Sequence, residues 1–105
     1  MPSKKKQCHV CPIAKVASLI GDYYSMLIIR DLLAGTKRFG DLASSLSGVS
    51  TRTLTIKLKK LEEHELIKRE EFSEKPPRVL YSLTKKGQGL HNITLSMKKY
   101  GEKYL

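Results

Sequence analysis

The sequence predicts a mainly helical domain with one small antiparallel β-hairpin in its C-terminal half. Apolar residues recur at three- and four-residue intervals over most of the chain, which is the period of an α-helix. Two runs with strand-like content, 67–73 and 78–83, flank a turn that contains prolines. A chain of 105 residues is long enough for a single core but leaves no room for a large substrate cavity as well.

The N-terminal part of the chain is expected to be an arm followed by a short helix. Residues 1–10 are polar and rich in lysine, so we predict a flexible basic arm there. Residues 11–105 form the single folded domain. Its first helix spans 12–20, because Pro12 suits a first helical turn and Gly21 ends the apolar pattern.

The next three helices include a helix-turn-helix. Apolar residues are so dense over 24–34 that a helix there should cross the centre of the core. A helix over 39–46 carries an apolar stripe and ends at a turn signal, Gly48. Ser50 then suits the N-cap position of a helix over 50–64. Two helices joined by such a turn form a helix-turn-helix.

The second helix of this pair has two chemically different faces. Its leucines, which recur at intervals of four and three residues and point toward the core, are Leu54, Leu58 and Leu61. At about 100° per residue, Arg52, Ile56 and Lys59 lie nearly opposite them. Acidic residues are absent over 50–60, whereas a solvated helix more often mixes its charges. We therefore predict that this face contacts a nucleic acid.

A hairpin and a last helix complete the prediction. The strands at 67–73 and 78–83 form a hairpin whose tip holds two prolines between Lys75 and Arg78. Thr84 then caps a helix over 84–103. A helix-turn-helix followed by a β-wing is the winged helix-turn-helix arrangement, which reads duplex DNA.

The last helix also predicts a homodimer. Its apolar residues form a stripe that so small a domain cannot cover by itself, and a partner subunit would cover it. These residues are Leu90, Ile93, Met97, Tyr100 and Tyr104.

Charge favours a nucleic acid as the partner. Lysine and arginine number 20 against 10 acidic residues, so the formal net charge is +10 and the pI about 9.8. Such a protein attracts polyanions, with an anionic membrane surface as the second possibility. No apolar run approaches the roughly 20 residues of a spanning helix, and the basic start lacks the apolar segment of a secretory signal. We expect a cytoplasmic protein that binds double-stranded DNA and enters no membrane.

Individual residues receive roles from their chemistry. Arg52 is the candidate for a bidentate contact to guanine, and Thr55 and Ile56 can contribute hydroxyl and methyl contacts. Lysines and arginines around them would bind phosphate, as would the first turn of the helix with its free N–H groups. The residues predicted to contact DNA are Lys37, Arg38, Ser50, Thr51, Arg52, Thr53, Thr55, Ile56, Lys59, Lys60, Lys75 and Arg78.

Cys8 and Cys11 form a C-x-x-C pair, which can mark redox chemistry, zinc or neither. Cys11 precedes the proline that starts the first helix, where the helix dipole and the nearby Lys15 favour a thiolate. That chemistry suits an oxidation sensor with Cys8 as resolving partner, and an inert buried cysteine at a dimer interface is the alternative. Zinc is disfavoured because Cys8, His9 and Cys11 offer too few ligands. We predict no metal and no cofactor.

Successive short motifs resemble the HxlR-type winged helix-turn-helix regulators, relatives of the MarR group. They are CPI at 11–13, Gly21, LIIRDL at 27–32, RFGDL at 38–42, STRTL at 50–54, LKKLE at 58–62 and PPRVLYSLT at 76–84. The resemblance implies a bacterial or archaeal transcription factor that acts as a homodimer on a palindromic operator. It also implies that the first helix, with Ile13 and Val16, joins the last helix at the dimer interface. In some members of the family, a cysteine at the position of Cys11 senses oxidants or electrophiles.

The chain departs from the family pattern at three places. Tyr23-Tyr24 stands where the family usually has a tryptophan after a basic residue, and Thr51 stands where a proline is common. Ile56 replaces a common glutamine, so a side chain on the predicted reading face can contact a thymine methyl but cannot hydrogen-bond to a base edge. We therefore expect an operator sequence of its own, and the residues specify neither that operator nor a small effector.

Two other classes of protein fit part of the evidence. A basic protein that coats nucleic acid without sequence preference needs only the charge. A thiol oxidoreductase would use the C-x-x-C pair, although that motif normally follows a strand in a βαβ unit and here precedes helices. Paired carboxylates, a nucleophile with its base, and a glycine-rich phosphate loop are all missing from the sequence, which favours a protein that is not an enzyme.

Overall fold

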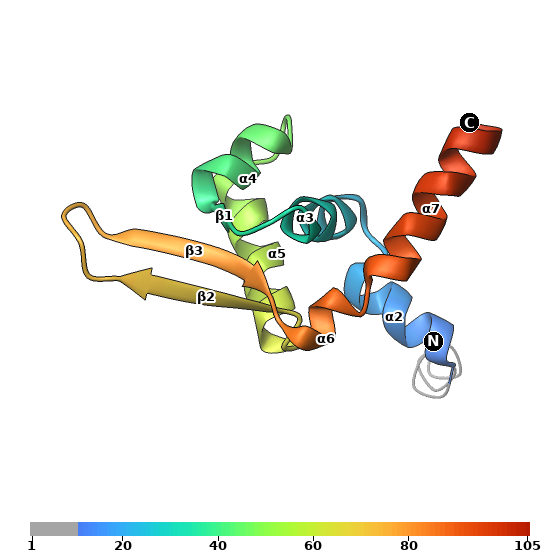
Figure 1. The fold of residues 1–105 in the computed structure, drawn as a ribbon, viewed down its shortest axis with the longest axis horizontal. Helices are drawn as coiled ribbons and strands as arrows, with labels where there is room; N and C mark the ends of the chain where they lie inside the picture. Colours follow the sequence, from blue (N-terminus) through green and yellow to red (C-terminus); the bar gives the residue numbers. More distant parts are fainter. Residues whose placement is uncertain (1–10) are drawn as a thin grey trace.

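The computed structural model describes residues 11–105, so the predicted N-terminal arm and Cys8 lie outside the described residues. In this part of the chain α3 lies at the centre, the β2–β3 hairpin projects at one end, and α7 leads away at the other (Figure 1). The elements in chain order are α2 (Pro12–Ile20), α3 (Tyr23–Leu33), β1 (Lys37–Arg38), α4 (Phe39–Ser45), α5 (Thr51–Glu63), β2 (Ile67–Phe72), β3 (Arg78–Leu83), α6 (Lys85–Gln88) and α7 (His91–Tyr104). The predicted helical domain with a small antiparallel sheet is confirmed.

The core lies between α3, the helix-turn-helix pair α4–α5, and the inner face of the sheet. Ile28 and Ile29 of α3 have no exposed surface, which confirms that this helix crosses the centre. The buried side chains that surround it are Ile20, Leu32, Leu42, Leu46, Leu54, Leu58, Leu61, Leu66, Ile67, Tyr81, Leu83 and Leu90. The leucine stripe of α5 thus faces inward as its spacing predicts.

Local capping sets both ends of α5. The Ser50 hydroxyl accepts the Thr53 backbone N–H at 3.0 Å, which satisfies one of the free donors of the first turn. At the other end Glu65 adopts a left-handed conformation, with φ of 60°, and the Leu66 N–H donates to the Leu61 carbonyl at 3.0 Å. This bond is that of a Schellman motif, which stops the helix and starts β2.

The sheet has three strands in the order β1-β3-β2, all antiparallel. Sequence analysis predicted β2 and β3, whose register pairs Ile67 with Leu83 and Phe72 with Arg78. The short strand β1 was not predicted, and it places Lys37 opposite Tyr81. Two residues are too few to show a periodic pattern, so β1 is defined only by its pairing with β3.

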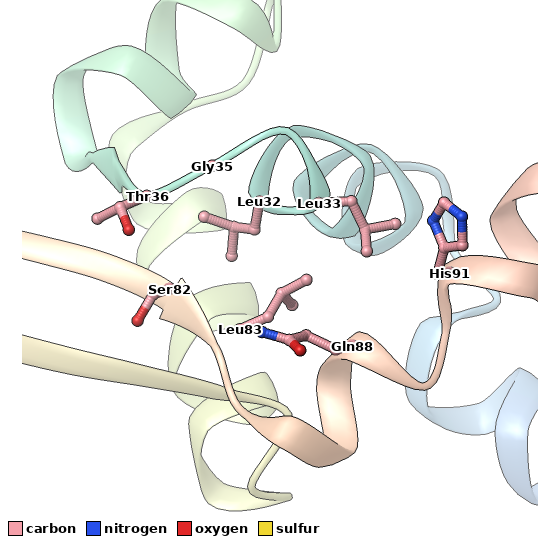
Figure 2. A pocket seen from close by; sticks show the side chains of 8 residues that line it. All are labelled: Leu32, Leu33, Gly35, Thr36, Ser82, Leu83, Gln88 and His91. Atoms are coloured by element: carbon pink, nitrogen blue, oxygen red, sulfur yellow. The ribbon is translucent and has the colours of Figure 1, made fainter.

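The last helix differs from the prediction because it is broken. A single helix was expected over 84–103, but α6 ends at Gln88 and α7 begins at His91. Figure 2 shows Gln88 and His91 on opposite sides of this break, with Leu83 near Gln88 and Leu33 near His91. Leu90 sits at the break itself and is only 9% exposed. Its assignment to the dimer interface is therefore wrong, because its side chain belongs to the core.

Within residues 11–105, no single helix is long and apolar enough to cross a membrane. The helices α2 and α3 reach the required length and composition only as a pair, which is bent by 84°.

Candidate nucleic-acid interface

The outward face of α5 is exposed and carries two unpaired cations. Arg52 and Lys59 are exposed, and Ile56 between them is 53% exposed. Within residues 11–105, neither the Arg52 nor the Lys59 side chain has a hydrogen-bonding or ion-pair partner. We call these three side chains the reading face. They are free to meet a ligand, because the opposite side of the helix supplies the leucines of the core.

The first turn of α5 has backbone N–H groups that lack an acceptor within the described residues. Ser50 uses its hydroxyl twice, as acceptor from the Thr53 N–H and as donor to Thr53 Oγ1 at 2.9 Å. The N–H groups of Thr51 and Arg52 have no acceptor in the described part of the chain. Free N–H groups and the positive end of the helix dipole favour a phosphate at such a position. Ser50 and Thr53 therefore shape the helix end, and the backbone N–H groups of Thr51 and Arg52 are left without an acceptor in the described residues.

Two residues predicted to contact DNA are engaged inside the protein. Thr55 donates its hydroxyl proton to the Thr51 carbonyl at 2.8 Å, within the same helix. Lys60 donates from Nζ to the Ser18 carbonyl of α2 at 2.8 Å, so it connects α5 to the first helix. The phosphate-binding role predicted for Lys60 stays a prediction, and in this structure the side chain caps a carbonyl near the end of α2.

A second lysine of α5 makes a contact that sequence reasoning missed. Lys57 Nζ lies 3.1 Å from Oδ2 of Asp22, and the same oxygen accepts the Ser25 N–H at 3.0 Å as the N-cap of α3. Burial opposes ionisation of Asp22, but hydrogen bonds from Ser25 and the Lys57 ammonium outweigh it and lower the pKa of this carboxyl. The N-cap signal was present in the sequence, since an aspartate precedes the helix. The pairing with Lys57, 35 positions later, has no such local signal in the sequence.

Replacing Asp22 should lower stability in a pH-dependent way. Asp22→Ala removes the cap and the ion pair, and we expect a loss of about 1 kcal/mol near neutral pH, mostly from the cap because the pair is partly exposed. Asp22→Asn keeps a capping oxygen and removes only the charge. Because folding lowers the pKa of Asp22 below its ordinary value of 3.8, its charge stabilises the fold above that pH and loses this effect as the pH falls further. Urea unfolding should show that Asp22→Asn has a lower free energy of unfolding than wild type near neutral pH. At about pH 3 this difference in stability should be smaller. A difference that grows toward acid would contradict this assignment.

The wing presents fewer free cations than its sequence suggests. Arg78 Nε lies 2.9 Å from Glu74 Oε2, and its guanidinium sits 4.7 Å from the centre of the Phe72 ring. Both contacts hold Arg78 half-buried along the hairpin. Lys75, in contrast, is exposed at the turn between the strands. Lys75 is therefore the more accessible cation of the hairpin tip, whereas Arg78 is engaged with Glu74 and Phe72.

The two cations before α4 lie in β1. Arg38 is exposed, and its backbone N–H donates to Asp41 Oδ2 at 2.9 Å, which fixes the start of α4. Lys37 is half-buried. The side chain of Arg38 is thus the more accessible of the pair.

An apolar groove lies between α2 and α7, away from the reading face. Its volume is about 430 Å³, and it is lined by Pro12, Ile13, Val16, Ala17, Ile20, Gly21, Met26, Ile93 and Met97. Ile13 is 81% exposed. Tyr100 and Tyr104 extend the apolar surface along α7, with their rings 4.8 Å apart. Apart from Leu90, the residues predicted for a dimer interface are therefore exposed on these two helices.

Cys11 is a free, half-buried thiol at the N-cap position of α2. Its side chain makes no capping hydrogen bond, so the sulfur does not cap the helix. Among residues 11–105, no group of three or more histidine, cysteine or acidic side chains could hold a metal ion.

A second hollow, of about 420 Å³, opens at the break between α6 and α7. Leu32, Leu33 and Leu83 line it together with polar side chains such as Gln88 and His91 (Figure 2). It lies beside the end of α3 and of β3, at the junction between the sheet and the last helix.

The fold and the exposed face of α5 define a winged helix-turn-helix protein that binds DNA. More narrowly, the chain belongs to the HxlR-like helix-turn-helix family, whose pattern it matches over residues 19–105. It is a transcriptional regulator of this family and not an enzyme. The predicted resemblance to HxlR-type regulators is confirmed, and the thiol oxidoreductase alternative is wrong.

Similar proteins, both by sequence and by solved structure, agree with this assignment to the family. The chain is 42% identical over 97 residues to the uncharacterised HTH-type transcriptional regulator sll1512 of Synechocystis sp., covering 92% of this chain and 72% of that protein. It is 33% identical to the HTH-type regulator YodB of Bacillus subtilis, covering 90% and 86% of the two chains. The redox regulator HypR in its oxidised form superposes with a TM-score of 0.86 at 33% identity, covering 90% of this chain and 98% of that one.

Proposed function

We propose that this protein is a cytoplasmic regulator that binds a palindromic operator as a homodimer. The observation that carries the proposal is the reading face, which is exposed on α5 while the leucines of the same helix lie in the core. Two copies related by a two-fold axis would present their α5 helices about one duplex turn apart, roughly 34–36 Å, to successive major grooves. The net charge of +10 would draw the dimer to DNA.

The proposed roles separate base contacts from phosphate contacts. Arg52, near the N-terminus of α5, is proposed to hydrogen-bond to a guanine, because its guanidinium has no partner in the described chain. Lys59, Arg38 and Lys75 are proposed to bind phosphate and to set the register of the dimer on the duplex. Lys37 is proposed as a weaker phosphate contact, since it is half-buried.

Selection of bound fragments from genomic DNA, followed by titration of the best fragment against competitor duplex, tests this function. A sequence-specific regulator should bind its site roughly a thousandfold or more tightly than random DNA. The selected fragment should contain two half-sites related by a two-fold axis. Equal affinity for every duplex, with a steep dependence on salt, would instead indicate the coating protein considered above.

The homodimer is proposed to form through the α2–α7 groove. Ile13 and Met97 both line it and are exposed in the single chain, and exposed apolar patches of this kind mark interfaces. Two copies that pack their grooves together would cover both patches at once, as a two-fold interface requires.

Met97→Glu should break the dimer. A carboxylate at this position would be solvated in the monomer but buried without a partner in the dimer, so we expect the dissociation constant to rise roughly a hundredfold or more. Sedimentation at several concentrations would measure it, with Met97→Leu as the matched control that keeps the apolar contact. An unchanged dimer in both variants would place the interface elsewhere.

We also propose that oxidation of Cys11 changes the affinity for DNA. Two solved relatives support this: HypR, a redox regulator with oxidised and reduced forms, and YodB, a transcriptional regulator with reduced and diamide-treated forms. Cys11 is itself a free thiol at the start of a groove-lining helix. In the proposed step the thiolate attacks hydrogen peroxide, which leaves a sulfenic acid and releases hydroxide. A second thiol, from Cys8 or from another copy, then condenses with it to form a disulfide and release water.

Cys11→Ser should abolish the response to peroxide. We expect wild-type affinity for the operator to change after treatment with peroxide and to return with dithiothreitol, while the serine variant binds identically in all three conditions. Cys8→Ser is the matched control, because a disulfide that still forms in this variant must join two copies through Cys11. A response that survives Cys11→Ser would contradict the proposal.

A further inference from the structure

The one exposed aliphatic side chain on α5 is Ile56, at 53% exposure. Within the described residues, the other exposed large apolar side chains lie on α2 and α7 or at the C-terminus, except for Tyr23 on α3. Ile56 does not line the α2–α7 groove, so it is not among the residues proposed to form the dimer. Its exposed side chain is therefore available to a different partner.

The neighbours of Ile56 identify the charge of that partner. Arg52 lies four positions before it and Lys59 three positions after it, so both side chains are its neighbours on the helix surface. An apolar group between two unpaired cations is a poor surface for another protein's hydrophobic patch, because docking would bury both charges. It complements a polyanion that offers an apolar spot between its charges.

The major groove of DNA offers such a spot. The C5-methyl group of thymine is the apolar feature that base edges present there, and 5-methylcytosine carries the same group. Isoleucine is branched at Cβ and holds essentially one χ1 rotamer in a helix, so Ile56 would meet a methyl group as a rigid surface. It has no donor or acceptor for the amino group of an unmodified cytosine.

We propose that Ile56 makes the operator prefer a C5-methylated pyrimidine at one position in each half-site. Thymine meets this preference, 5-methylcytosine meets it in part, and cytosine does not. The inference rests on the proposed function and deepens it, because it assigns the chemical class of base that one residue of the reading face recognises.

Replacement of each thymine in the selected operator by deoxyuridine tests the inference, since this change removes only the methyl group. We expect one position per half-site at which the change weakens wild-type binding about fourfold, the effect of removing one buried methyl-sized group from a contact. Replacing that thymine by cytosine should weaken binding at least as much, and 5-methylcytosine should recover part of the loss.

Variants of the protein test whether the dependence of binding on the methyl group comes from Ile56. Ile56→Ala should bind the thymine and deoxyuridine operators equally, whereas Ile56→Val should keep most of the difference. Lys59→Ala is the matched control on the same face, since it should weaken both operators alike and preserve their ratio. Tight binding to the operator with no methyl dependence, or with one that survives Ile56→Ala, would overturn the inference and leave the proposed function standing. Failure to find any tight site would instead count against the proposed function.

Discussion

Gly87→Ala is expected to destabilise the domain by roughly 3 kcal/mol. A Cβ added at this buried position would overlap the Leu66 carbonyl oxygen and would lie 3.0 Å from the Leu66 carbonyl carbon and from Leu83 Cδ2. That carbonyl cannot move away without cost, because it accepts the Thr84 N–H at 3.0 Å and the Thr84 hydroxyl at 3.1 Å. The substitution therefore forces apart α6 and the segment that connects α5 to β2.

Urea unfolding followed by circular dichroism measures the effect, with Gly40→Ala as the matched control. A Cβ at Gly40 meets no atom within 4 Å, and the residue lies inside α4. The control should leave stability unchanged or raise it by up to about 1 kcal/mol, because alanine favours helices over glycine. Equal unfolding midpoints for wild type and Gly87→Ala would show that the Leu66 carbonyl can move freely.

Arg52→Ala should remove most of the discrimination at one base pair of each half-site. A bidentate contact from arginine to guanine contributes about 1–3 kcal/mol of selectivity, equivalent to roughly 5–150-fold in affinity for the right base over the wrong one. Arg52 is exposed on the reading face and its side chain has no hydrogen-bond or ion-pair partner in residues 11–105, so its removal should not disturb the fold. Titration of operators altered one base pair at a time would locate the position that loses its preference.

Lys59→Ala provides the contrast that makes this result interpretable. A lysine that binds phosphate adds affinity without sequence information, so this variant should bind every duplex more weakly and release about one fewer counterion. The dependence of log affinity on log salt measures that number. If Arg52→Ala behaved in the same way as Lys59→Ala, then Arg52 would be a phosphate contact and another residue would read the base.

The helices of the DNA-binding unit could be predicted closely because their signals are local. Ser50 and Thr84 cap the helices that follow them, and Gly48 lies in the turn with φ of 85°. The leucine spacing of α5 predicts that Arg52 and Lys59 lie outside, since a helix that buries one face must expose the opposite one.

Which charged side chains form contacts inside the protein could not be predicted in this way. Lys59 and Lys60 are adjacent and chemically identical, yet the Lys59 side chain has no partner within residues 11–105 and Lys60 donates to a carbonyl 42 positions earlier. Arg78 likewise has the charge of a DNA contact, but it pairs with Glu74 and lies against Phe72. Such assignments depend on which surfaces the fold brings within hydrogen-bonding distance.

The sequence by itself determined the helices up to α5, the two strands of the hairpin, the inward face of α5 and the cationic character of its outward face. These properties follow from periodicity and capping, which act over a few residues. Only the tertiary structure decided that Lys37 and Arg38 form a third strand, that the last helix breaks, and that Leu90 is buried there. Each of these depends on contacts between segments far apart in the chain, and short-range patterns carry no information about such contacts.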